Sequence, residues 1–216
     1  MVSRRLGRAR AALDVDTGGG EVLAWALAHA SARPPVLAAV EGWAANVEVA
    51  RRLGDFGVRI AYVSANAPLP FDDGSFDLVV SRHPVRTDWG EVARVLRPGG
   101  SYLSQQVGAG SNKELTDFLM GHQPVGGARK TTTVITGAEG AGLKVRDLRE
   151  ATLRVVFFDI GAVVHFLRKV TWTVPDFSVE PYRDQLVALH RMIERSGSFV
   201  CHSTRFLIEA TKPVTA

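Results

Sequence analysis

Cysteine is nearly absent from this sequence, since Cys201 is the only one among 216 residues. A single thiol cannot form an intrachain disulfide or supply by itself the ligands of a structural zinc site. Long hydrophobic runs are also lacking: the longest candidate, around residues 155–167, is interrupted by Asp159 and Gly161 and is too short for a membrane span. The N-terminal MVSRRLGRAR is not followed by the apolar segment of a secretory signal. We therefore expect a cytoplasmic protein.

The charge balance is mildly basic, with a formal net charge of +4. The hydrophobic fraction of 46% and the charged fraction of 22% are those of an ordinary globular protein. Two arginine clusters could contact phosphate: Arg4, Arg5, Arg8, Arg10, Arg51 and Arg52. No interleaved aromatic side chains accompany them, so a solvated basic tail over residues 1–10 and a solvated helix face are favoured over nucleic-acid binding.

The first half of the chain alternates short apolar runs with helical patterns. The predicted strands are Ala11–Val15, Val36–Val40, Val58–Val63, Ser75–Ser81 and Ser101–Val107. The predicted helices are Glu21–Ala30, Trp43–Leu53 and Trp89–Leu96, the last stopped by Pro98-Gly99-Gly100. This alternation predicts a doubly wound α/β fold with a parallel sheet. Right-handed crossovers bring the carboxyl ends of the strands to one edge, where ligands of such sheets bind.

The second half is less regular and begins with a loop rich in glycine and basic residues over Gly121–Lys130. The predicted helices are Thr132–Ala141, Ile160–Val170 and Tyr182–Arg195. The predicted strands are Leu143–Leu148, Leu153–Phe158, Phe199–His202 and a closing strand Arg205–Ala210. No internal repeat or low-complexity linker is present. We therefore expect one domain over residues 1–216, with a helical insertion at about 159–198.

The stretch LDVDTGGGEVL (13–23) places three glycines between an apolar run and a helical pattern, as in loops that wrap a nucleotide-like ligand. A Walker-type loop is excluded because no lysine follows Gly20. A dinucleotide fingerprint fits poorly, because a pattern that starts at Gly18 would have Leu23 at its third glycine.

The remaining pattern, Asp14-Val-Asp16-Thr-Gly18-Gly-Gly20, resembles the acidic-x-G-x-G-x-G loop of class I S-adenosylmethionine-dependent methyltransferases. Further stretches resemble the same family in the same order. They are LAAVEGW, which ends the second strand with Glu41, SANAPLPFDDGSFDLVVSRH (64–83), EVARVLRPGGSYLSQ (91–105) and the final RFLIEATKP. The resemblance implies a Rossmann-like, mostly parallel seven-stranded sheet with an antiparallel last strand, and S-adenosyl-L-methionine as cofactor, with S-adenosyl-L-homocysteine as product.

The resemblance also implies roles for individual residues. Gly18 and Gly20 would let the backbone approach the cofactor, and Glu41 could accept both ribose hydroxyls. Asn66 would accept the adenine amino group, beside an apolar wall that includes Leu69 and Phe71. The expected cofactor-binding residues are Asp14, Asp16, Gly18, Gly20, Glu41, Asn66, Ala67, Leu69 and Ser81.

Two features depart from the family pattern. Asp16 replaces the first glycine of the loop and adds a negative charge near the methionine carboxylate, unless it faces the sulfonium or caps the helix. Only about ten residues precede the first strand, whereas family members carry helices there that close over the site. A lid could come from Ile160–Val170 or from a partner chain, including a second copy in a homodimer.

The acceptor is expected beyond the end of the fourth strand, at Ser81-Arg82-His83-Pro84. His83 is the candidate general base because imidazole titrates near neutral pH, although a hydrogen-bonded loop histidine is the plainer interpretation. No Asn/Asp-Pro-Pro-Tyr stretch and no cysteine follow this strand, which disfavours base, glutamine and carbon-5 pyrimidine methylation.

These observations favour methyl transfer to oxygen, nitrogen or carbon of a small molecule. Two alternatives remain. A catalytically impaired binding or partner protein is suggested by Asp16 and the short N-terminal segment, and an RNA methyltransferase is suggested only by the basic charge balance.

Overall fold

The computed structural model describes residues 1–214. The elements of its first half are α1 (Val2–Leu6), β1 (Ala11–Val15), α2 (Glu21–Ala28), β2 (Val36–Glu41), α3 (Ala44–Ala50), the 3-10 helix η1 (Arg51–Phe56), β3 (Arg59–Tyr62), β4 (Phe76–Arg82), α4 (Trp89–Val95) and β5 (Leu96–Val107). Those of the second half are α5 (Lys113–Met120), α6 (Thr131–Gly140), β6 (Lys144–Phe157), α7 (Ile160–Lys169), η2 (Glu180–Tyr182), α8 (Arg183–Ser196) and β7 (Phe199–Thr211).

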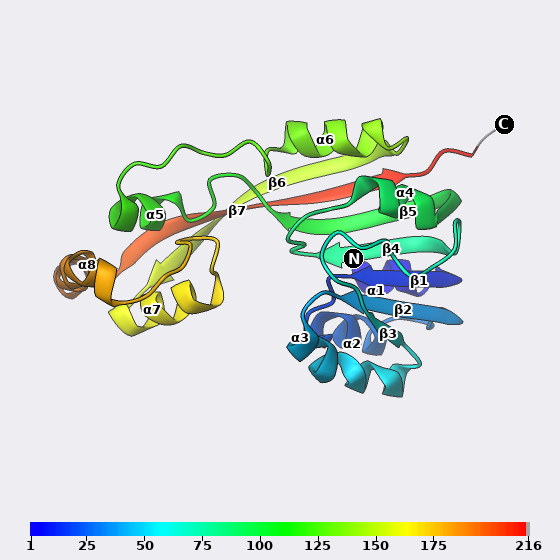
Figure 1. Cartoon of the computed structure of the whole chain (residues 1–216), viewed down its shortest axis with the longest axis horizontal. Helices are drawn as coiled ribbons and strands as arrows, with labels where there is room; N and C mark the ends of the chain where they lie inside the picture. Colours follow the sequence, from blue (N-terminus) through cyan, green and yellow to red (C-terminus); the bar gives the residue numbers. More distant parts are fainter. Residues whose placement is uncertain (215–216) are drawn as a thin grey trace. The chain divides into compact units, whose positions relative to one another are not determined.

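The strands form one seven-stranded sheet in the order β3-β2-β1-β4-β5-β7-β6 (Figure 1). The pairs β1–β2, β1–β4, β2–β3 and β4–β5 are all parallel. Strand β7 runs antiparallel to β5, since Gly99 N–H donates to Lys212 O while Gly108 N–H donates to Thr204 O. The predicted doubly wound fold with an antiparallel last strand is therefore confirmed. The strand order reverses between β1 and β4, where ligands of such sheets bind.

Both faces of the parallel strands are buried, which explains their continuous apolar runs. Ala11 and Leu13 of β1 pack in a cluster with residues of α4 and α6. Ala12, between them, packs with Leu23 of α2 and with residues of α1, α3 and η1 on the opposite face. This two-sided packing fixes where each strand ends, and so where the ligand edge lies.

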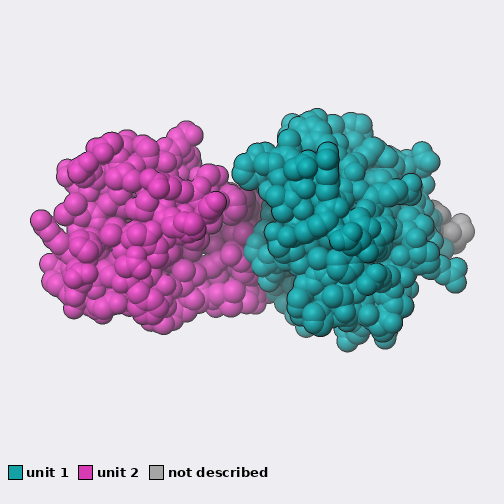
Figure 2. Space-filling view, turned by 90° about the horizontal axis from the view of Figure 1, so that it is seen from below, with its two compact units in different colours: residues 1–106, 132–149, 206–216 teal, residues 107–131, 150–205 magenta. Residues whose placement is uncertain are grey.

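The chain divides into two compact units, coloured separately in Figure 2. The first comprises residues 1–106, 132–149 and 206–216 and contains the glycine-rich loop. The second comprises residues 107–131 and 150–205 and has a core of its own from α5, α7 and α8, with Leu167 and Leu189 fully buried. The predicted helical insertion at about 159–198 falls within the second unit.

Several element boundaries differ from those predicted. The Pro98-Gly99-Gly100 segment lies inside β5 as a bulge, because Phe76 pairs with Leu96 and Leu78 pairs with Ser101. Strand β6 is continuous where two short strands were expected, because residues 149–152 between them stay extended and exposed. Strand β7 likewise joins two predicted strands, and its buried positions continue through Ser203.

The N-terminal segment, expected as a basic tail over residues 1–10, contains helix α1. Leu6 is buried against the α2 side of the sheet, and Arg5 forms an ion pair with Glu209 of β7. Helix α5 is not among the predicted elements, although Leu115 and Leu119 stand four residues apart and are both buried. Within residues 1–214, no helix is long and apolar enough to cross a membrane.

Candidate active site

The glycine-rich loop leaves β1 through three residues with left-handed backbone conformation. Their φ angles are 57° at Asp16, 61° at Gly18 and 79° at Gly20, after which α2 begins. A Cβ on Gly20 would lie 2.7 Å from Cδ1 of the buried Leu53, so this position requires glycine. Asp16 adopts the conformation for which the family pattern has glycine, and aspartate tolerates it better than most residues.

The Glu41 carboxylate, at the end of β2, holds this loop. The side chain is buried, with 7% exposure. Its Oε2 accepts a hydrogen bond from Gly18 N–H at 2.7 Å, and its Oε1 accepts one from Trp43 N–H at 2.9 Å. Since each carboxylate oxygen has a second lone pair, both can still accept a ligand hydroxyl.

Three carboxylates, Asp14, Asp16 and Glu41, surround the loop. Burial raises the pKa of Asp14 to about 7; a 2.7 Å hydrogen bond from Thr17 Oγ1 opposes this shift, and the charges of Asp16 and Glu41 add to it. Burial, followed by the charge of Glu41, also raises the pKa of Asp16. A bound cation would stabilise the ionised form of all three, so the loop favours a positively charged ligand.

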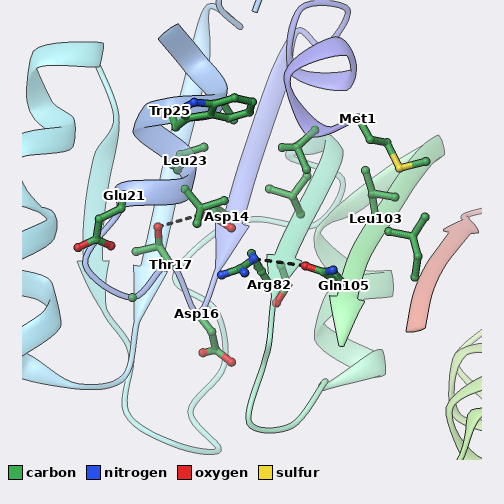
Figure 3. A pocket seen from close by; sticks show the side chains of 17 residues that line it. Met1, Asp14, Asp16, Thr17, Glu21, Leu23, Trp25, Arg82, Leu103 and Gln105 are labelled. Carbon is green, nitrogen blue, oxygen red and sulfur yellow. Dashed lines mark hydrogen bonds between the residues drawn. The ribbon is translucent and has the colours of Figure 1, made fainter. Parts of the chain in front are cut away.

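A cavity of about 440 Å³ opens beside this loop (Figure 3). Its polar side carries Asp14, Asp16, Arg82 and Gln105, from the ends of β1, β4 and β5. Apolar side chains of α1, α2, β5 and β7 line its other side, and Trp25 lies there. The volume is within the usual range of small-molecule sites, roughly 300–1,000 Å³.

A second cavity, of about 80 Å³, lies next to the segment between β3 and β4 and is lined in part by Ala67, Leu69 and Tyr102. Asp16 and Ser81 line both cavities. Asp16 directly follows β1, and Ser81 lies near the end of β4. The two strands are neighbours, and their register pairs Val15 with Ser81. The two cavities therefore lie on either side of Asp16 and Ser81, at the point where the strand order reverses.

Residues 13–104 match the family model described as a methyltransferase domain. Over these residues the chain is therefore similar to a methyltransferase domain. The match covers β1 to β5, and it includes the glycine-rich loop, Glu41 and the residues common to both cavities.

Solved structures with this fold cover nearly the whole chain. The YcgJ protein of Bacillus subtilis is 21% identical with a TM-score of 0.64, over 95% of this chain and 93% of its own. A Bacillus halodurans protein proposed to be a methyltransferase is 20% identical with a TM-score of 0.62, over 94% and 92%. Geranyl diphosphate methyltransferase in complex with S-adenosylmethionine is 14% identical with a TM-score of 0.54, over 94% and 77%. No curated protein matches the chain.

Six of the nine residues predicted to bind the cofactor line one or both cavities. Asp14, Asp16, Gly18 and Ser81 line the large cavity, and Ala67 and Leu69 line the small one together with Asp16 and Ser81. Gly20, Glu41 and Asn66 line neither. Gly20 and Glu41 shape the loop instead, while Asn66 lies exposed with a φ of 66°.

His83, the predicted base, follows β4 with a φ of 56°. Its backbone N–H donates to the backbone oxygen of Gln105 at 2.8 Å. The residue is half-buried and is not among those that line either cavity. The neighbouring Arg82 does line the large cavity.

The structure adds a pair of residues that sequence reasoning missed. Glu91 and Arg94 of α4 fasten the segment that carries Leu69 and Phe71. Glu91 Oε2 accepts from Leu69 N–H at 2.6 Å, and Arg94 donates to Leu69 O at 2.9 Å, to Phe71 O at 2.7 Å and to Asp73 Oδ1 at 2.9 Å. The Arg94 guanidinium lowers the pKa of Glu91 through their hydrogen bonds. We call this pair the loop clamp.

A second missed feature is a neutral polar group behind the small cavity. Gln106 donates to Thr87 Oγ1 at 3.1 Å and to the Tyr102 hydroxyl at 3.4 Å. Burial raises the pKa of Tyr102, so its hydroxyl is uncharged at neutral pH. These hydrogen-bonding groups are uncharged and lie beside the charged Arg86, Asp88 and Glu91 of the same cavity lining.

Proposed function

We propose that this protein transfers the methyl group of S-adenosylmethionine to a small-molecule acceptor at the residue pair Asp16 and Ser81, which both cavities share. The observation that carries the proposal is that Asp16 and Ser81 line both cavities at the reversal point of the sheet. The glycine-rich loop, with Gly20 packed against Leu53, supports it.

The residues fit the parts of the cofactor by chemistry. Glu41 can accept the ribose hydroxyls, and Ala67 and Leu69 offer an apolar contact to adenine beside the small cavity. Asp14 and Asp16 match the ammonium and sulfonium charges, and Gly18 leaves its backbone open to the methionine part. Asn66 is proposed as the acceptor of the adenine amino group, as the resemblance implies.

When bound, S-adenosylmethionine supplies a methyl carbon that takes a lone pair from the acceptor while the carbon–sulfur bond breaks and leaves its electron pair on sulfur. The chain's own contribution is to orient the acceptor and to exclude water from the reacting atoms. His83 is proposed to take the proton of an acceptor that loses one. If His83 has this role, the methylation rate of His83→Gln should no longer change with pH near neutrality, while its affinity for the cofactor should stay unchanged.

The pH dependence of cofactor affinity tests the role of Asp14. Its pKa is about 7 in the free protein, and a bound cation would lower it, so binding below pH 7 must release a proton. As pH increases towards 7, the affinity for S-adenosylmethionine should rise by up to about tenfold per pH unit, and above pH 7 it should level off. Calorimetry in buffers of different ionisation enthalpy measures the released proton. Asp14→Asn should flatten the profile; an unchanged profile would assign the proton to Asp16, whose pKa is also raised.

Asp16 stands where the family pattern has glycine, and the structure allows the effect of this difference to be predicted. Its charge faces both cavities, so Asp16→Asn should weaken binding of cationic S-adenosylmethionine by about threefold to tenfold relative to neutral-sulfur S-adenosylhomocysteine. Asp16→Gly should do the same and, by relieving the left-handed conformation, stabilise the fold by about 1 kcal/mol. Calorimetric titration of the native chain and both variants with both ligands measures this ratio.

The same titration tests the proposed function. Micromolar binding of both ligands by the native chain is expected. Binding by Asp16→Gly alone would instead mean that Asp16 disables the site, and would favour the impaired binding or partner protein. Salt-dependent RNA binding in preference to small acceptors would favour the RNA methyltransferase.

Two further predictions from the sequence remain proposals. A partner chain or a second copy is proposed to complete the lid over the acceptor, which size measurements with and without S-adenosylhomocysteine would detect. A cytoplasmic location is proposed from the scarcity of cysteine and would be tested by cell fractionation.

A further inference from the structure

The large cavity extends beyond the groups that match the cofactor. The apolar part of its lining, which we call the apolar arm, includes Val2, Val22, Trp25, Ala26, Leu103 and Leu207. These residues come from α1, one face of α2, β5 and β7, and all belong to the first compact unit. The charged side chains of the lining, Asp14, Asp16, Glu21 and Arg82, come from the glycine-rich loop and its flanks and from the end of β4, so the apolar arm suits a hydrocarbon chain or ring.

The Trp25 indole is fixed in place although 62% of its surface is exposed. It stacks on the His29 ring with centroids 4.2 Å apart and an interplanar angle of 25°. The His29 Nδ1 lies 2.8 Å from Trp25 O, which holds the histidine ring to the same turn of α2. An exposed but oriented aromatic ring is a ready apolar wall for a ligand.

Arg82 places a positive charge at the polar side of the same cavity and is the only lysine or arginine in its lining. Its Nε donates to Gln105 Oε1 at 3.3 Å. Across residues 1–214, no carboxylate lies within ion-pair distance of its guanidinium. The two terminal nitrogens of the guanidinium match a carboxylate geometrically.

We propose that the acceptor of this methyltransferase is an amphipathic anion, with its apolar body in the apolar arm and its anionic group on Arg82 and Gln105. The inference rests on the proposed function, because it assigns the acceptor of that same site. A cationic head group would be repelled by Arg82, and a wholly apolar ligand would gain no charge-assisted hydrogen bond from it.

The carboxylate of S-adenosylmethionine is a second source of the same anionic chemistry. The two sources are separable because decarboxylated S-adenosylmethionine lacks that group. If Arg82 binds the acceptor, Arg82→Gln should have only a small effect on the affinity for S-adenosylmethionine, and the same small effect on the affinity for its decarboxylated form.

The direct experiment is calorimetric titration of the full chain with octanoate, octylamine and acetate. Octanoate should bind at least about tenfold more tightly than either of the others, since only octanoate fits both ends of the cavity. Arg82→Gln should weaken octanoate by about tenfold to a hundredfold, and Trp25→Ala by about tenfold. Arg51→Gln and Trp172→Ala are matched controls, because both residues are exposed and lie outside the lining.

The outcomes separate this inference from the proposed function. The inference, but not the proposed function, would be overturned if the chain bound the cofactor and did not bind octanoate. The same holds if Arg82→Gln and Trp25→Ala left octanoate binding unchanged. A loss of S-adenosylmethionine affinity in Arg82→Gln that is absent for the decarboxylated form would assign Arg82 to the cofactor, and would also overturn it. Octanoate binding without cofactor binding would support the amphipathic site and contradict methyl transfer.

Discussion

Arg94→Met is expected to lower the free energy of unfolding by about 2–4 kcal/mol. The guanidinium is 27% exposed and the Glu91 carboxylate 19%, so removing Arg94 leaves a mostly buried charge without its counter-ion. It also leaves Leu69 O and Phe71 O without their donor. Because these residues belong to the segment beside the small cavity, affinity for S-adenosylhomocysteine should fall as well. Chemical denaturation and calorimetry measure the two effects.

The loop clamp also has a pH signature. The pKa of Glu91 is lowered in the folded protein, so its stabilisation is present above the unfolded value and is lost as pH falls through the folded value. The stability difference between native and Arg94→Met should therefore shrink in acid. The double variant Glu91→Gln/Arg94→Met should be more stable than Arg94→Met alone, and Arg51→Met, on an exposed residue, should have little effect. Equal stability of the single and double variants would show that no stranded carboxylate causes the loss.

Glu41→Gln is the second change with a large expected effect. In the native chain each carboxylate oxygen accepts a backbone N–H, from Gly18 and from Trp43. A glutamine amide has one oxygen and one NH₂ group, so in either orientation two donors would face each other. We expect the free energy of unfolding to fall by about 1–3 kcal/mol and S-adenosylhomocysteine affinity to fall by about tenfold or more.

Thermal denaturation and titration with S-adenosylhomocysteine check this prediction. Glu48→Gln is the matched control, because the Glu48 side chain is 68% exposed and its partner Arg51 is also on the surface. A Glu41→Gln variant that is destabilised but retains native affinity would limit Glu41 to positioning the loop. A variant with native stability and reduced affinity would limit it to contact with the ligand.

The parallel core and its ligand edge could be predicted from local sequence alone. Runs such as Ala11–Val15 are apolar on both faces of the strand, and the structure buries alternate residues against helices on opposite sides. The glycine-rich loop could also be predicted, because the left-handed backbone conformation at Gly18 and Gly20 favours glycine over other residues. Such signals lie within a few neighbouring residues.

Long-range hydrogen bonds and strand pairing were not readable in this way. The loop clamp joins Arg94 to Leu69, 25 residues away, and the bulge at Pro98–Gly100 depends on the register with β4. Polar residues inside β6 resemble a loop in sequence but remain extended in the sheet. Each depends on a partner that the local pattern does not identify.

The sequence by itself determined the methyltransferase fold, the glycine-rich loop and the acidic residue that follows the second strand. Only the tertiary structure decided that Glu41 binds the loop backbone, that Asp16 and Ser81 line two cavities, and that Arg82 and Trp25 line the larger one. The physical reason is range. Periodicity and backbone conformation are encoded in adjacent residues, whereas a cavity is defined by side chains from several elements, whose directions are fixed only when the strands pair and the helices pack.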